Sequence, residues 1–565
     1  MNSDLTEDVS QEPPNANPQP APAKRKAGGY AALVAAGILL SRMAGLVRTA
    51  VFAHYLGASR AADAFNVALK VPNFLQNLLG EGVLSASFIP VYARLLAKGD
   101  EKLAGRVAGV FVSFLTLGVM LIVLAGVLLT PVILGITAAG LPPETMELAI
   151  RLTRMIFPGI GLLVLYAWSL GILNAHRQFF ISYVAPVLWN AAMITTLVIF
   201  GTRLRNADLA VALAWGTVIG CILQFAIQVP FLMKHEKHLS FGLDRTLEPV
   251  RNIFRNIIPV VGGRGVVQIS GYVDTFIASF LGPGAIANLV YAQTIYMAPI
   301  SIFGMSVAAA ELPQMAGETG TDEEIRAALR KRLDRGIRQI AFFVIPTIAA
   351  FLVIGRLIVA ALYQRGEFSA DATLIVWYVL CGSTIGLLVA TQARLYSSAF
   401  YALHDPKTPF RYAMARVGVG ATLGILFAFP LRPMFRTMIE TLGLPLPALG
   451  HLNDALGVVG ITAATGIAAW LEYFLLRRGM NRKIGRGESK SGYFVRLWIA
   501  ALAGAFAGLA AHLYLLRDLV AGFPLPRITE FLLVTGIFGV VYFLLCYVFG
   551  IPEAKATLGR FLKRR

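Results

Sequence analysis

Charged residues and cysteines are both scarce in this chain. Only 14% of its 565 residues are charged, whereas 57% are hydrophobic, and the mean hydropathy is +0.68. Soluble domains carry about 25% charged residues, so this composition indicates a protein that crosses a membrane several times. The three cysteines lie far apart in apolar stretches: Cys221, Cys381 and Cys546. They predict neither a disulfide framework nor a metal site.

Signatures of common enzyme classes are also missing. The sequence has no Walker A motif and no cluster of histidine, cysteine and carboxylate residues at ligand spacing. These absences argue against ATP hydrolysis and metal catalysis, and we expect no cofactor. No hydrophilic segment between apolar stretches exceeds about 25 residues, which is too short for a folded catalytic domain outside the membrane.

Long apolar stretches fill most of the chain. Each is at least about 18 to 20 residues long, which is enough for a helix to cross a bilayer. We count fourteen, near residues 31–56, 64–93, 107–136, 148–173, 179–201, 208–233, 256–281, 285–312, 339–363, 372–402, 411–431, 452–476, 495–516 and 528–550. The expected fold is therefore all-α, a polytopic membrane protein with about 14 transmembrane helices.

Basic residues are distributed unevenly between the two sides of these stretches. Alternate loops and both tails hold 33 Lys and Arg residues, whereas the opposite loops hold eight. Because cytoplasmic loops carry the excess of Lys and Arg, both termini are predicted to be cytoplasmic. The net charge of +19 is then an orientation signal with some attraction to anionic lipid, and no nucleic-acid partner is expected.

The first half of the chain is partly repeated in the second half, at an offset of 223 to 228 residues. The matching segments are Leu56-Gly57 with Leu281-Gly282, Pro72 with Pro299, Ile89-Pro90 with Leu312-Pro313, and Asn174-Ala175-His176 with Ala402-Leu403-His404. Six apolar stretches separate each pair. An even number gives both halves the same orientation, so we expect two six-helix lobes related by a pseudo-twofold axis along the membrane normal. Two C-terminal helices remain outside this duplication.

A polar stripe follows one face of the second apolar stretch. Its residues recur every three or four positions: Asp63, Asn66, Lys70, Asn73, Asn77, Glu81 and Ser85. Within a membrane helix, such a stripe is predicted either to line a polar cavity or to form a self-neutralising structural network. Pro72 is expected to kink this helix.

Nine basic residues lie within the apolar stretches: Arg42, Arg48, Lys70, Arg151, Arg154, Arg264, Arg356, Arg394 and Arg416. A cation near the bilayer centre costs at least about 2.5 kcal/mol, so each needs a partner, a wet cavity or the headgroup layer. Four lie near the ends of their stretches and are expected to snorkel: Arg151, Arg154, Arg356 and Arg416. Arg394 could serve either role. Clustered arginines favour an anionic substrate, because guanidinium groups match phosphate oxygens.

The second half carries its own polar face. Arg264, Gln268, Thr275 and Ser279 share one helical face with Asp274 close by, which predicts a second basic site opposite the first. Two further acids, Glu311 and Glu472, are either paired structurally or coupled to protons, and the sequence leaves both alternatives open.

Five ordered motifs resemble those of the MurJ (MviN) lipid II flippases, a family of the multidrug/oligosaccharidyl-lipid/polysaccharide exporter superfamily. They are Ser41-Arg42-Met-Ala-Gly45-Leu-Val-Arg48, Ala62-Asp63-Ala64-Phe65, Lys70-Val-Pro72-Asn73, Glu81-Gly82-Val-Leu-Ser85-Ala-Ser-Phe88-Ile-Pro90 and Phe400-Tyr-Ala-Leu-His-Asp-Pro-Lys407-Thr-Pro409. The resemblance covers most of residues 31–550. It implies two lobes around a central cavity, with two extra helices forming a groove for a polyprenyl tail.

The resemblance also implies a function. The expected substrate is the undecaprenyl-diphosphate-linked disaccharide-pentapeptide, moved from the cytoplasmic to the periplasmic leaflet of the bacterial inner membrane by alternating access. By the same resemblance, the substrate-binding residues are Arg42, Arg48, Asp63, Lys70, Asn73 and Glu81. The protein is then a transporter rather than an enzyme, is expected to work as a monomer, and would act near cell-wall synthases.

The sequence departs from the family pattern in both halves. Gln76, Gln293, Thr294 and Met297 stand where many members carry charged residues, and we hypothesise that Arg264 supplies the missing cation of the second lobe. Asp274 resembles a sodium-site aspartate, but its usual Asn/Asp partners are absent between residues 411 and 430. These absences argue against sodium binding at Asp274. Asp274 and Glu311 are still candidates for ion coupling, and the membrane potential, H⁺ and Na⁺ stay open as driving forces.

These expectations divide the chain into five parts: a disordered tail (1–29), a first lobe (30–235), a second lobe (236–490), a lipid-tail groove (491–551) and a basic tail (552–565). The main alternative function is a flippase for another polyprenyl-linked glycan, such as O-antigen units. A drug/cation antiporter is less favoured, because an arginine-rich cavity repels organic cations. A polyprenyl-lipid glycosyltransferase would need a placed acid/base group and room for a second substrate.

Overall fold

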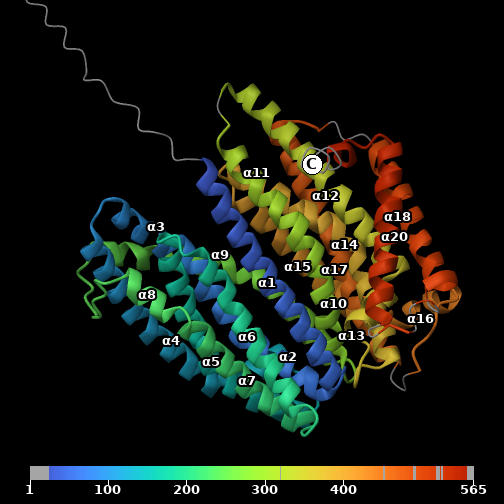
Figure 1. Cartoon of the computed structure of the whole chain (residues 1–565), viewed down its shortest axis with the longest axis horizontal. Coiled ribbons are helices and arrows are strands. Elements are labelled where there is room, and N and C mark those ends of the chain that lie inside the picture. Colours follow the sequence, from blue (N-terminus) through green and yellow to red (C-terminus); the bar gives the residue numbers. More distant parts are fainter. Residues whose placement is uncertain are drawn as a thin grey trace, which may run out of the picture.

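The computed structural model describes residues 24–318, 320–448, 452–487, 491–516, 519, 522–523 and 526–556. All regular elements in these ranges are helices, and Figure 1 shows two inclined bundles with α1 between them. We call α1 to α8 the first lobe and α9 to α17 the second lobe. The predicted all-α fold is confirmed.

The first lobe consists of eight α-helices and one π-helical segment. They are α1 (Lys24–Leu56), α2 (Arg60–Leu75), η1 (Gln76–Gly82), α3 (Val83–Ala97), α4 (Glu101–Thr137), α5 (Pro143–Ala175), α6 (Phe179–Phe200), α7 (Asn206–Ala226) and α8 (Val229–His235). The second lobe comprises α9 (Glu248–Ser279), α10 (Ala285–Pro299), η2 (Ile300–Met305), α11 (Ser306–Ala316), α12 (Asp322–Val353), α13 (Gly355–Tyr363), α14 (Ala370–Ala402), α15 (Lys407–Ala428), α16 (Arg432–Thr441) and α17 (Leu452–Ile484).

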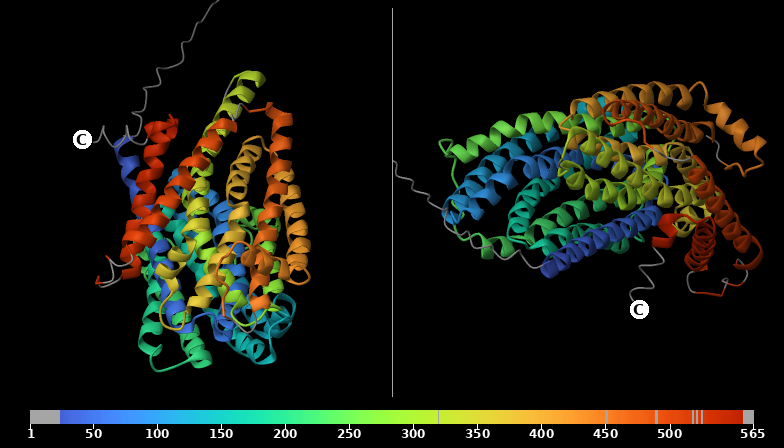
Figure 2. Two further views of the ribbon diagram at one scale, coloured as in Figure 1. Left: turned by 90° about the vertical axis from the view of Figure 1, so that its right-hand side faces the viewer. Right: turned by 90° about the horizontal axis from the view of Figure 1, so that it is seen from above.

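The last helices lie at the outer edge of the second lobe, as both Figure 1 and the view from above in Figure 2 show. They are α18 (Ser491–Ala511), η3 (His512–Leu516) and α20 (Pro526–Val548). A separate buried apolar cluster joins them to α12, and the Tyr542 hydroxyl donates a hydrogen bond to the Phe342 carbonyl at 2.5 Å. The extra pair is thus attached to one lobe, through α12.

The predicted count of 14 spans is not confirmed. Among the described residues, 11 helices are long and apolar enough to cross a membrane, or up to 12 if α15 and α16, bent by 68°, form one span. The predicted stretch 64–93 is divided into α2, η1 and α3, and Gly80 leaves helical geometry with ψ −106°. The stretch 256–281 lies in α9, which also contains Arg251, Arg255 and Arg264 and is correspondingly less apolar.

The predicted repeat has a counterpart in the backbone. Left-handed residues recur 227 positions apart, at Gly57 and Gly284 and again at Arg177 and His404. Pro72 and Pro299 show the same offset, and a π-helical segment follows each proline within four residues. The predicted match of Gly57 with Gly282 was therefore wrong by two residues, and that of His176 with His404 by one. The left-handed turns align Gly57 with Gly284 and Arg177 with His404.

Small residues bring the helices of the second lobe close together. A Cβ atom placed on Gly386 of α14 would lie 2.6 Å from the Cα atom of Gly466 in α17. Close backbone approach at small residues is the usual basis of helix association in membranes. This packing fixes α14 and α17 as a rigid pair that carries several of the charged side chains described below.

Candidate functional site

The two predicted arginines of α1 have different surroundings. Arg48 is half-buried, and its guanidinium carbon lies 4.9 Å from the centre of the Trp189 ring on α6, a cation–π contact. Arg42 is exposed, and within the described ranges it has no hydrogen-bond or ion-pair partner. Helix α1 runs unbroken past Gly45, so it does not bring the two arginines onto one face.

Asp63 joins the two lobes. Its side chain is only 4% exposed, and its carboxylate accepts hydrogen bonds from the backbone N–H groups of Gly284 (2.7 Å) and Ala287 (2.8 Å). These donors belong to the first turn of α10, whose N-terminus favours a negative charge. Asp63 of α2 therefore caps a helix of the other lobe.

Further contacts around Asp63 form what we call the seam, where residues 54–63 of the first lobe meet residues 284–291 and 363–367 of the second. The Tyr291 hydroxyl donates to the Gly57 carbonyl at 2.6 Å, and the Glu367 backbone N–H donates to the His54 carbonyl at 2.8 Å. The seam thus holds the lobes together through backbone groups at one end of the molecule.

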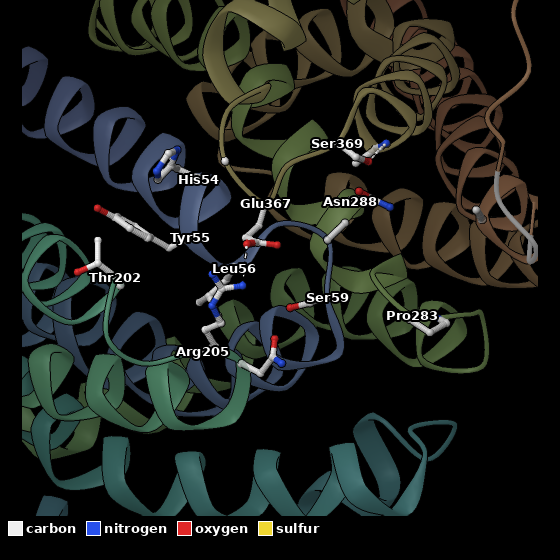
Figure 3. A pocket seen from close by; sticks show the side chains of 16 residues that line it. His54, Tyr55, Leu56, Ser59, Thr202, Arg205, Pro283, Asn288, Glu367 and Ser369 are labelled. Atoms are coloured by element: carbon white, nitrogen blue, oxygen red, sulfur yellow. Dashed lines mark hydrogen bonds and ion pairs between the residues drawn. The ribbon is translucent and has the colours of Figure 1, made fainter.

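A polar cavity of about 580 Å³ opens beside the seam and is lined by both lobes. Figure 3 shows Arg205 of the first lobe and Glu367 of the second pointing toward one another, with their charged atoms 3.7 Å apart. Asn288 also lines the cavity; it is 5% exposed, and its side-chain oxygen has no partner among the described residues. This cavity exists only while the lobes are in contact.

Lys70 is the second interlobe residue of the predicted stripe. Its ammonium group donates to the Gly271 carbonyl at 2.5 Å and to the Thr275 hydroxyl of α9. In return, the Tyr272 hydroxyl donates to the Lys70 carbonyl at 2.8 Å. In this conformation the stripe faces the other lobe at Asp63 and Lys70.

The structure gives fewer contacts for three other predicted substrate-binding residues. Asn73 is half-buried on α2, one residue after Pro72. The side chains of Glu81 and Arg264 lie outside the described residues, so their predicted roles stay predictions.

The acids of the second lobe are surrounded by cations. Asp274 accepts a hydrogen bond from the Thr465 hydroxyl at 3.3 Å and interacts electrostatically with Lys70 and Arg416. Glu311 lies 3.7 Å from Arg332. Glu311 thus has an arginine nearby and Asp274 has hydroxyl and cationic neighbours, and ion coupling by either acid stays a prediction.

Arg416 was expected to snorkel, but its guanidinium lies 3.4 Å from the Glu472 carboxylate. Helix α15 begins at Lys407, which places Arg416 more than two turns inside the helix and away from its end. Glu472 thus has an arginine partner, and its coupling to protons stays a prediction.

The segment that connects the lobes is attached to the first lobe through a cluster that the sequence did not suggest. The Tyr92 hydroxyl donates to the Glu236 carboxylate and lies 2.9 Å from the His176 ring nitrogen. The rings of His176 and His235 stack with centres 5.6 Å apart. Only the tertiary fold brings these residues together, since they come from α3, the end of α5, and α8 with the segment after it.

Two inclined helical lobes that meet at the seam and carry charged side chains, on helices long enough to cross a membrane, define a multi-span membrane transporter. The family profile described as "Lipid II flippase MurJ" matches residues 52–529. The chain belongs to the MurJ family of lipid II flippases, which are inner-membrane transporters rather than enzymes.

Curated relatives agree with this assignment. The chain is 30% identical to "Probable lipid II flippase MurJ" of Haemophilus influenzae, over 82% of this chain and 89% of the relative. It is 29% identical to "Lipid II flippase MurJ" of Burkholderia cenocepacia, over 91% of this chain and 96% of the relative.

Solved structures support the fold. The structure titled "Lipid II flippase MurJ, inward closed conformation" matches with a TM-score of 0.72 and 24% identity, over 92% of this chain and 98% of that one. An inward-facing multidrug resistance MATE family transporter of the MOP superfamily matches with a TM-score of 0.59 and 16% identity, over 80% and 98% of the two chains. This chain and both solved structures therefore share one fold.

Proposed function

We propose that this protein is a lipid II flippase, which moves the undecaprenyl-diphosphate-linked disaccharide-pentapeptide from the cytoplasmic to the periplasmic leaflet by alternating access. The observation that carries the proposal is the cap that Asp63 forms on α10, because it joins the two lobes through hydrogen bonds that have to break when the lobes separate. The family and its curated relatives support lipid II as the substrate.

We place the seam on the periplasmic side and both termini in the cytoplasm. The turns that flank the seam carry few basic residues, whereas the N-terminal cluster and the loops on the other side carry many. The conformation is then closed on the periplasmic side, and the seam must separate before release to the periplasm.

We assign the parts of the substrate to different residues by their chemistry. Arg42 and Arg48 are proposed to bind the diphosphate, with Asn73 and Glu81 contributing polar contacts to the head group. The isoprenyl tail would stay in lipid along α18 and α20, because burying each CH₂ group in apolar surroundings contributes about 0.8 kcal/mol. Asp63 and Lys70 would reach the substrate only after they release the second lobe.

We also propose that Asp274 is the better candidate for ion coupling, since it faces a hydroxyl and two cations rather than one fixed partner. The driving force would be the membrane potential, H⁺ or Na⁺. A monomer close to cell-wall synthases is the proposed working unit.

Reconstituted protein and fluorescent lipid II test this function. Proteoliposomes should expose lipid II to an externally added head-group-modifying enzyme, and an O-antigen-type polyprenyl lipid should move more slowly. Complementation of a strain depleted of its lipid II flippase is the matching cellular test. Movement of the O-antigen lipid alone, or failure to complement despite confirmed expression, would contradict the proposal.

A further inference from the structure

The second lobe contains a charge cluster that the proposed substrate contacts do not use. We define it as Tyr296 of α10, Arg394 of α14, Arg416 of α15 and Glu472 of α17. Arg394 interacts electrostatically with the other three residues. Four helices thus converge on one arginine, which lies eight residues before the end of α14.

The cluster is not electrically balanced. Two described carboxylates interact with it: Glu472, which lies 3.4 Å from Arg416, and Asp274, which also interacts with Lys70. Arg394 is exposed and has no hydrogen bond or ion pair with any described residue. Two acids thus face three cations, Arg394, Arg416 and Lys70, which leaves one positive charge in excess.

An uncompensated arginine within a membrane helix is costly, and it persists where it faces water, lipid headgroups or an anionic ligand. Snorkelling alone would not explain the neighbours of Arg394. Arg416 repels it, Glu472 offsets part of this repulsion, and an anion that binds between or beside the two arginines would reduce it further. Glu472 and the rigid α14–α17 pair hold Arg416 in place, so the arrangement is fixed before any ligand arrives.

We propose that Arg394, with Arg416 beside it, is an anion-binding residue of the second lobe, which binds an oxyanion of the transported lipid. This inference rests on the proposed function. The shared chemistry is a phosphate or carboxylate group bound by a guanidinium fork. Its two sources in the substrate are the diphosphate and the carboxylates of the peptide.

This assignment gives each lobe an exposed arginine, Arg42 in the first and Arg394 in the second. A substrate held from both lobes responds to their relative movement, which is what alternating access requires. The contribution of Arg394 is independent of Arg264, whose side chain lies outside the described residues.

Equilibrium binding to the full-length protein in lipid nanodiscs tests the proposal. Arg394→Gln should weaken lipid II binding about tenfold or more, and Arg394→Lys should give an intermediate loss because it keeps the charge without the fork. Arg356→Gln is the matched control: it removes an exposed arginine of the same lobe, on α13, and should bind like the wild type. Melting temperatures of all variants report folding.

Glu472→Gln separates ligand binding from a structural role. It frees Arg416 and makes the cluster more positive, so lipid II should bind as tightly as to the wild type or more tightly. If Glu472→Gln weakens binding as much as Arg394→Gln does, the cluster is structural and the proposal is wrong. Binding by Arg394→Gln within twofold of the wild type also overturns it.

Two ligands identify the source of the anion. An equal fold-loss for undecaprenyl diphosphate and for lipid II assigns Arg394 to the diphosphate, whereas a loss confined to lipid II assigns it to the peptide carboxylates. Either result supports the proposal. Failure of the wild type to bind or move lipid II would instead contradict the proposed function, so the two failures are distinguishable.

Discussion

Asp63 Oδ2 of the first lobe lies 2.7 Å from the backbone nitrogen of Gly284 in the second lobe. The other carboxylate oxygen bonds to Ala287 one turn further along, so one side chain satisfies two N–H groups that the helix itself leaves unpaired. Both bonds break when the lobes separate. The free energy of the closed seam therefore depends directly on this carboxylate.

Asp63→Asn should shift the protein toward separated lobes. The amide loses the charge and offers one acceptor instead of two, which should cost the closed state about 1–3 kcal/mol. Spin labels on Thr202 and Thr441, which are exposed on different lobes, would report the change by double electron–electron resonance. We expect a longer-distance population to grow.

Asp208→Asn is the control for this measurement, since Asp208 is exposed in the first turn of α7. It should leave the distance distribution unchanged. Identical distributions for Asp63→Asn and Asp208→Asn would show that the cap does not hold the lobes together.

Gly284→Ala should destabilise the seam from the opposite side. Gly284 has φ +79°, and a Cβ atom there would collide with the Ala58 carbonyl oxygen of the first lobe. Gly443→Ala isolates the backbone contribution, because Gly443 has φ +64° and open space around it. Both variants should lose about 1–2 kcal/mol from the left-handed backbone, and Gly284→Ala should lose more. Thermal unfolding compares the two, and equal losses would rule out the collision.

The apolar stretches and the motifs around Arg42 and Asp63 were sufficient to predict a helical membrane protein of this family. The sequence also placed Asp63 and Lys70 on one face of a helix. It could not show that this face meets the first turn of α10 and the backbone of α9, since that depends on how the lobes pack. Arg416 was misplaced for two reasons: α15 begins at Lys407, earlier than predicted, and the partner Glu472 lies on another helix.

Lys70→Gln should loosen the contact between α2 and α9. Removing the ammonium group breaks two charge-assisted hydrogen bonds, to the Gly271 carbonyl and the Thr275 hydroxyl, which should cost about 1.5–3 kcal/mol in thermal unfolding. Gly271→Ala is the matched control, because a Cβ atom there would lie 3.9 Å from the Lys70 ammonium, an ordinary contact. Equal stability of the two variants would contradict an interlobe role for Lys70.

The attachment of the segment that connects the lobes should weaken in acid. Burial lowers the pKa of His176, which lies just outside α5, and the nearby Glu236 offsets only part of this effect. Because the unfolded imidazole has a pKa of about 6.5, the unfolded chain binds the proton more readily, and stability is lost as the pH falls below about 6.5. Hydrogen exchange in residues 236–247 should therefore quicken between pH 7.5 and pH 5.5, after correction for the intrinsic rate.

Two histidine variants are the controls for this measurement. His176→Gln should reduce the pH dependence, whereas His404→Asn, at the exposed equivalent turn of the second lobe, should retain it. The same pH dependence in His176→Gln as in the wild type would assign the effect to another group.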